Sequence, residues 1–260
     1  MNHAMGSIMM TVGIVLSVSA ELPRVIAHRG GSFEQEENTL AGFKASYEKG
    51  ARGFETDIRL TADRRAVVLH DDTLDRTTDG KGRVDQLTAA EIASVRTKKT
   101  GQPLSFLEEL LDFIQSKPDA FIHVELKSGR SDAEVAALCE TAMKAVADRN
   151  LTARTVFISF DVRALKKIKA LDPKQQTCLI LGEVNANAIR IAREIRAEYL
   201  SAHLGNLYRN FAHEAHKAGL KVTAWTISGS ADAQLAILMA TDYVTTDLPA
   251  QQLERKTARP

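Results

Sequence analysis

The chain repeats one pattern along most of its length, in which a short run of apolar, often β-branched residues is followed by an amphipathic helix. The strand-like runs cover residues 24–28, 53–58, 120–126, 155–160, 176–182, 198–203, 220–227 and 242–249. Nearly continuous apolar runs are typical of parallel strands buried on both faces. Eight such alternations at this chain length predict an α/β protein that forms a single (β/α)8 TIM barrel.

The predicted helices begin at residues that cap helix N-termini. One is expected from Thr39, capped by Asn38, and one over 105–116, opened by a capping box of Ser105 and Glu108. A doubly wound open sheet is the alternative fold, but no glycine-rich dinucleotide fingerprint follows the first strand. Further helices are expected from Asp132 behind Ser131, after Asp161, and near 187–196, 209–218 and 231–240.

Residues 66–70 are a further strand-like run, close behind the second barrel strand. The intervening segment is only about half the dozen residues that a parallel crossover needs. We therefore expect an antiparallel hairpin that turns at 63–64, with Asp57 opposite His70. This hairpin opens a short insertion, 61–103, and returns His70 to the second strand.

The composition indicates one globular domain, which we place at 23–256. The chain has 260 residues, of which 44% are hydrophobic and 26% charged, and its formal net charge is +1. A nearly neutral chain gives no reason to expect nucleic-acid binding. The two cysteines, Cys139 and Cys178, fall in helix and strand patterns, and we expect both to be buried free thiols.

Residues 1–22 are either a tag remnant or a signal segment. The apolar stretch 8–18 is too short to span a bilayer, so no stable membrane insertion is expected. Residues 18–20, Val-Ser-Ala, resemble a signal-peptidase site, but no Lys or Arg precedes Ile8. The protein is expected to be exported, to a periplasm or the medium, if residues 1–20 are a signal peptide, and cytoplasmic otherwise.

Acidic residues stand at the carboxyl ends of two predicted strands, where barrel enzymes carry their working residues. Glu55 and Asp57 share one face of the second strand, and Glu125 lies on the third. Three converging carboxylates repel one another unless they are protonated or bind a cation, and oxygen ligands suit Mg²⁺ or Ca²⁺. The alternative is that Arg52 or Arg59 neutralises Glu55 and Asp57 through ion pairs.

Histidines and cations accompany these acids. His28 ends the first strand and His70 the hairpin, so the two rings are candidates for a general base and a general acid. Arg29 and Lys127 are candidates for binding a phosphate group. Two further candidates for contacting substrate stand near strand ends, and both also suit a structural role: His203 and Trp225.

Several of these residues lie in motifs that resemble the glycerophosphodiester phosphodiesterase family in order and spacing. The motifs are AHRG (27–30), ENTLAGF (37–43), ETD (55–57), VVLHDDTLDRTTDGKG (67–82), VELK (124–127), ISF (158–160), AWT (224–226) and TTDLP (245–249). The resemblance covers about residues 25–250. It implies a TIM barrel that uses a divalent metal to hydrolyse glycerophosphodiesters, its small-molecule substrates, to an alcohol and sn-glycerol 3-phosphate.

By position, the resemblance implies metal ligands at Glu55, Asp57 and Glu125, acid–base residues at His28 and His70, and phosphate contacts from Arg29 and Lys127. The chain departs from the family at Glu36, where proline is usual, and in a short 82–103 segment.

A lysophospholipase D-like hydrolase or lyase on the same barrel is the alternative activity. A catalytically inactive phosphate-binding protein is a third interpretation. Oligomeric state, head group and choice of cation stay open.

Overall fold

The computed structural model of the protein describes residues 22–251, and in it eight parallel strands close into a barrel. Each strand pairs with the next one around the ring, and β1 pairs with both β9 and β2, so the barrel has no open edge. The predicted TIM barrel is confirmed, and the open doubly wound sheet is excluded. The barrel strands are β1 Arg24–Ala27, β2 Gly53–Leu60, β4 Phe121–Leu126, β5 Thr155–Ser159, β6 Gln176–Leu181, β7 Tyr199–His203, β8 Lys221–Ile227 and β9 Tyr243–Thr246.

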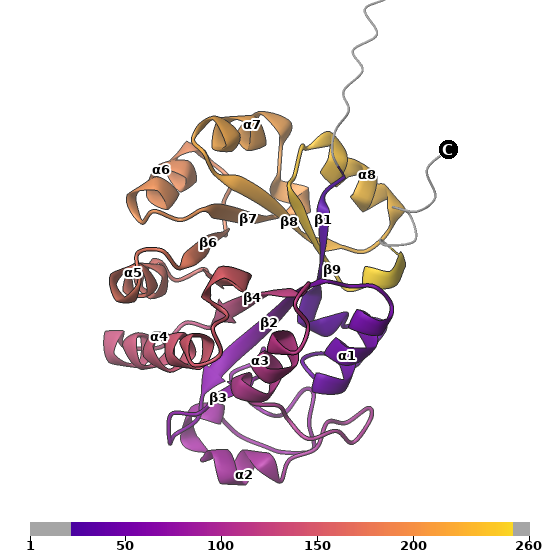
Figure 1. Ribbon diagram of the computed structural model, residues 1–260, viewed down its shortest axis with the longest axis vertical. Coiled ribbons are helices and arrows are strands. Elements are labelled where there is room, and N and C mark those ends of the chain that lie inside the picture. The colour runs from indigo at the N-terminus through magenta and orange to yellow at the C-terminus, as the bar shows by residue number, and fades with distance from the viewer. Residues whose placement is uncertain (1–21, 252–260) are drawn as a thin grey trace, which may run out of the picture.

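Helices surround the strands on the outside of the barrel (Figure 1). They are α1 Leu40–Glu48, α3 Leu107–Gln115, α4 Asp132–Ala147, α5 Val162–Leu171, α6 Ala186–Glu194, α7 Arg209–Lys217 and α8 Ser230–Leu238. The caps predicted at Ser131 and Asp161 are confirmed, because each side chain accepts a backbone N–H of the first turn. Short 3-10 turns occupy His28–Gly30 (η1), Val84–Gln86 (η2), Thr152–Arg154 (η3) and Leu204–Asn206 (η4).

Helix α1 is capped one residue later than predicted. Thr39, not Asn38, accepts the N–H of Gly42, at 3.1 Å. The side chain of Asn38 instead donates to Asp57 Oδ2 at 2.9 Å. The predicted cap is wrong because a buried carboxylate of the barrel requires this amide as its hydrogen-bond donor.

Helix α3 shows the same kind of correction. The box predicted for Ser105 and Glu108 is displaced by one residue, so that Glu109 accepts the N–H of Phe106 at 2.8 Å. Ser105 Oγ accepts the N–H of Leu40, at 3.3 Å, and so connects two helices. Here too, a residue that the local pattern assigns to a helix cap, Ser105, forms a tertiary hydrogen bond instead.

The predicted hairpin exists, but its register differs by one residue. Strand β3, Ala66–Val68, runs antiparallel to the end of β2, outside the barrel. The N–H of Leu69 donates to the carbonyl oxygen of Asp57 at 3.0 Å, so Leu69 and not His70 lies opposite Asp57. The loop is centred on Asp63, with Arg64 in the left-handed region at φ 63°. A hairpin loop centred on a single residue changes every cross-strand pair by one residue, compared with a loop centred between two residues.

The insertion forms a small body of its own beyond the ring of helices, with α2, Ala89–Ala93, at the bottom of the view in Figure 1. It has a separate apolar cluster that includes Val84 and Ile92, both fully buried. Phe54 on β2 is also fully buried, against the rings of Phe43 and Phe113. The insertion therefore has an apolar cluster of its own, separate from the one in which Phe54 packs.

Three remaining predictions concern termini, thiols and membranes. The tag or signal interpretation of the N-terminal segment concerns residues that lie, but for Leu22, outside the described range. Cys139 and Cys178 are buried free thiols, as predicted. Among the helices of residues 22–251, none combines the length and hydropathy needed to cross a bilayer.

Candidate active site

Three carboxylates meet inside the mouth of the barrel, as the strand pattern predicts. Glu55 and Asp57 point to the same side of β2, and Glu125 of β4 lies beside Asp57 in the parallel register. One oxygen from each carboxylate lies within 4.8 Å of the other two. Glu55 and Asp57 are buried and Glu125 is nearly so, which makes this a preformed group of oxygen atoms that could hold a cation.

Two cations flank the carboxylates. Lys127 Nζ lies 2.8 Å from Asp57 Oδ1 and 2.7 Å from Glu125 Oε1. Arg29 contacts the other side, with Nε 3.3 Å from Asp57 Oδ2 and its backbone N–H donating to Glu55 Oε2 at 3.0 Å. The residues proposed for phosphate binding are thus positioned by the same acids that are proposed to bind metal.

The alternative ion pairs considered from sequence do not form. Arg52 pairs with Asp119 at the opposite end of β2, at 2.5 Å. Arg59 donates from Nε to the backbone oxygen of His70 at 2.9 Å. The positive charge beside Asp57 comes from other strand ends, which proximity in sequence does not reveal.

The positive charges of Lys127 and Arg29 do not fully balance the negative charges of the three carboxylates. Burial, followed by the charge of Asp57, raises the pKa of Glu55 to about 8. Burial and the charge of Asp57 also raise the pKa of Glu125. Burial opposes ionisation of Asp57 as well, but Lys127 and Arg29 hold the pKa of Asp57 below its usual range. An all-oxygen group with surplus negative charge fits a hard divalent cation, so the residues present suit the implied metal.

His28 follows β1 and is held by an acid that sequence reasoning assigned no role. Its Nδ1 lies 2.6 Å from Asp247 Oδ1, an oxygen that also accepts the hydroxyl hydrogen of Ser32. Its Nε2 faces the acidic group, 3.8 Å from Glu55 Oε2. Burial acts to lower the pKa of His28, but the hydrogen bond with Asp247 and the charge of Glu55 outweigh it, and the pKa is raised.

His70 has an equivalent arrangement on the other side of the site. Its Nδ1 lies 2.7 Å from Asp71 Oδ1, and Arg76 donates to both oxygens of Asp71. Arg76 also donates to both oxygens of Glu37, which accepts a hydrogen bond from Arg29 at 3.2 Å. Burial lowers the pKa of His70, with the charge of Asp57 opposing it.

Each ring is therefore anchored through Nδ1 by an aspartate, which leaves Nε2 for a reacting group. Sequence reasoning placed both rings but missed the residues that orient them. Two features of the sequence could have indicated these residues: Asp247 is an acid at the end of a strand, and Asp71 directly follows His70. The chain Arg29–Glu37–Arg76–Asp71 has no such local signal.

His203 and Trp225 contact each other rather than the charged group, with T-shaped rings 5.3 Å apart. Trp225 also meets the ring of Phe160 edge-on at 6.2 Å, and Phe160 is 49% exposed. These residues form an aromatic wall at the ends of β5, β7 and β8. Phe160 was missed, because only the closure of the barrel brings its strand end near β8. The substrate-contacting roles of His203 and Trp225 stay predictions.

Comparison with known proteins decides the family. Residues 28–251 match the model of the glycerophosphoryl diester phosphodiesterase family. This chain belongs to that family. As a glycerophosphoryl diester phosphodiesterase family member it is a phosphoric diester hydrolase, which confirms the enzyme class predicted from its motifs.

Similar proteins include one curated relative and two solved structures. The chain is 32% identical over 231 residues to a glycerophosphodiester phosphodiesterase of Caldanaerobacter subterraneus, covering 86% of this chain and 94% of the relative. A phosphodiesterase of Oleispira antarctica, solved with the product sn-glycerol-3-phosphate, superposes with a TM-score of 0.84 at 25% identity, over 91% and 98% of the two chains. A glycerophosphodiester phosphodiesterase of Parabacteroides distasonis gives 0.81 at 27%, over 92% and 99%.

Proposed function

We propose that the protein hydrolyses glycerophosphodiesters to an alcohol and sn-glycerol 3-phosphate, with a divalent cation and with His28 and His70 as the acid–base pair. The observation that carries this proposal is the arrangement around Glu55, Asp57 and Glu125. Two imidazoles, each anchored by an aspartate, and two cationic side chains surround these acids. The relative solved with sn-glycerol-3-phosphate supports the choice of product.

The residues that would hold the cation are Glu55, Asp57 and Glu125, with Mg²⁺ or Ca²⁺ as the ions that suit oxygen donors. When bound, such an ion supplies positive charge that polarises the phosphoryl group. Arg29 and Lys127 orient the phosphate through its non-bridging oxygens and stabilise the charge that develops there. Both side chains are held in place by Asp57, so they need little rearrangement when substrate binds.

The two histidines carry the proton transfers. One Nε2 accepts the proton of the attacking hydroxyl or water, and the other donates a proton to the departing alcohol oxygen. Asp247 and Asp71 fix the ring orientations through Nδ1 and stabilise the imidazolium forms. The attacking group is either water or the 2-hydroxyl of the substrate's glycerol.

The test is release of glycerol 3-phosphate from glycerophosphocholine in a coupled assay. Turnover should disappear with EDTA and return with Mg²⁺ or Ca²⁺, and Glu55→Gln should weaken cation binding in calorimetry. His28→Ala and His70→Ala should each reduce turnover by about 10²- to 10⁴-fold with unchanged circular dichroism. The exposed His213 provides the matched control, since His213→Ala should leave the rate unchanged. Near-normal rates in both site variants would contradict the acid–base assignment.

The aromatic wall supports a second candidate, a lysophospholipase D-like activity. The exposed ring of Phe160 beside Trp225 offers an apolar surface for an acyl chain at the barrel mouth. This candidate predicts faster turnover of lysophosphatidylcholine than of glycerophosphocholine, and a loss confined to the lysolipid in Phe160→Ala. Equal effects of that substitution on both substrates would rule the second candidate out.

A further inference from the structure

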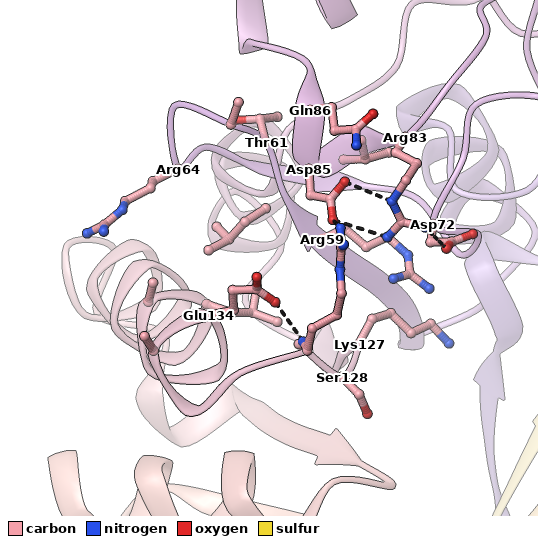
Figure 2. Close-up of a pocket in the computed structure, with 18 residues that line it drawn as sticks. Arg59, Thr61, Arg64, Asp72, Arg83, Asp85, Gln86, Lys127, Ser128 and Glu134 are labelled. Atoms are coloured by element: carbon pink, nitrogen blue, oxygen red, sulfur yellow. Dashed lines mark hydrogen bonds and ion pairs between the residues drawn. The ribbon is translucent and has the colours of Figure 1, made fainter.

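A cavity of about 360 Å³ lies between the insertion and the outer side of the active site. The end of β2 and η2 form one wall, the β4–α4 loop and the first turns of α4 the other. In Figure 2 the side chains of Arg59, Arg83 and Lys127 lie on one side of this space and α4 with Glu134 on the other. Lys127 lines the cavity and also contacts Asp57 and Glu125, so this side chain stands between the cavity and the acidic group.

The lining of the cavity is basic. Five cationic side chains line it against three acidic ones. Arg83 pairs with Asp72 and Asp85, and Arg130 pairs with Asp85 across the gap between insertion and barrel. These ion pairs hold the two walls together but leave part of the positive charge without a partner.

Arg59 is a half-buried guanidinium that forms no ion pair within residues 22–251, although the charge of nearby Asp72 acts on it. Within residues 22–251 its only hydrogen bond runs from Nε to the backbone oxygen of His70, and it forms no ion pair. Its two Nη groups form no hydrogen bond with these residues, and Arg59 is one of the residues that line the cavity. A desolvated guanidinium of this kind binds planar or tetrahedral anions in bidentate fashion.

Arg59 also stands at a defined place relative to the acidic group. Glu55, Asp57 and Arg59 are alternate residues of one strand, so their side chains share a face. Arg59 lies two residues, or about 7 Å, beyond Asp57 along β2. A group bound to Arg59 is thus one short linker away from a phosphate bound at Lys127, on the side of His70.

We propose that this cavity is the subsite for the alcohol head group, and that Arg59 selects glycerophosphodiesters whose head group carries an anion, either a carboxylate or a phosphate monoester. The inference rests on the proposed hydrolysis of glycerophosphodiesters and adds the class of substrate. The glycerol half of such a substrate bears only hydroxyl groups. Only the alcohol half brings a second anion for the unpaired guanidinium.

The experiment compares glycerophosphoserine with glycerophosphoethanolamine, which differ by one carboxylate, in wild type and in Arg59→Gln. The glutamine amide retains a donor for the His70 carbonyl oxygen while the charge is lost. Wild type should prefer glycerophosphoserine in kcat/KM, and Arg59→Gln should lower kcat/KM for this substrate by about 10- to 100-fold, the effect of one charge-assisted hydrogen bond. The value for glycerophosphoethanolamine should change less than about threefold.

Arg65→Gln is the matched control, because Arg65 belongs to the same hairpin but pairs with Glu108 outside the cavity. It should keep the wild-type substrate ratio. Glycerophosphoglycerol with and without a terminal phosphate tests the phosphate-monoester source in the same way, and a preference in either pair that Arg59→Gln removes supports the subsite.

Equal loss for both members of each pair would assign Arg59 a structural role at His70 and overturn the inference. So would a wild type with no preference in either pair. Absence of glycerol 3-phosphate release from every substrate would refute the proposed function itself, and the subsite with it.

Discussion

The contact between His28 and Asp247 allows the sharpest test of how this site works. In Asp247→Asn the carbonyl oxygen of the amide still accepts the Nδ1 hydrogen, but the charge that stabilises the imidazolium is removed. A hydrogen bond to a charged group contributes about 1.5–3 kcal/mol when buried. Because the His28 and Asp247 side chains are 19% and 33% exposed, solvent screening reduces this to about 1–2 kcal/mol.

That free energy corresponds to a loss in kcat of about 5- to 30-fold with little change in KM. Asp247→Ala removes orientation as well as charge and should cost more. The pKa of His28 should fall in both variants, because its partner raises it, so the limb of the pH–rate profile that His28 controls should move to lower pH.

The assay is the coupled release of glycerol 3-phosphate across pH, with Ser32→Ala as the control. The Ser32 hydroxyl donates to the same oxygen of Asp247 and forms no hydrogen bond with the ring, so its loss should change kcat less than about threefold. A kcat of Asp247→Asn within twofold of wild type, with an unshifted pH profile, would refute the reasoning that this acid stabilises charged His28.

Three further predictions concern stability. In the metal-free protein, burial and Asp57 raise the pKa of Glu55 from its ordinary value of 4.5 to about 8. The contribution of Glu55 to the free energy of unfolding should therefore be fully present below pH 4.5 and be lost as the pH rises to about 8. Urea titrations at pH 5 and pH 8 should show this loss, and Glu55→Gln should reduce it. Glu36→Ala removes the acceptor of hydrogen bonds from Thr97, Lys99 and Thr100 and should expose the bonds after Lys98 and Lys99 to trypsin; unchanged digestion would contradict the anchoring role. Phe54→Ala should lower the free energy of unfolding by about 3–5 kcal/mol, whereas Phe33→Ala, at a 78% exposed side chain, should change it by less than about 0.5 kcal/mol.

The role of Glu36 connects the insertion to the chemistry. Glu36 accepts hydrogen bonds from within residues 97–100 of the insertion. Glu37 accepts hydrogen bonds from Arg29 and Arg76. Asn38 donates a hydrogen bond to Asp57. Three consecutive residues thus join the outer segment, the proposed phosphate contacts and the proposed metal ligands. A proline at position 36 would lack the carboxylate on which the first of these contacts depends.

Much of the fold and part of the candidate site could be predicted from local pattern. The alternation of strands and helices can be recognised from residues that are neighbours in sequence. Eight repeats of a strand and a helix then predict a closed parallel barrel. Closure in turn brings strand ends to one rim, which is why the sequence already predicts that Glu55, Asp57 and Glu125 lie together.

The tertiary structure alone decided the contacts between residues that lie far apart in the chain. Asp247 meets His28 because β9 closes against β1, and Asn38 leaves its helix cap because the buried Asp57 carboxylate accepts its amide hydrogen. The hairpin register depended on a loop centred on one residue, a difference that hydrophobic pattern does not resolve. Local sequence determines which groups reach the rim, but the free energy of burying each charge determines which distant partner it takes.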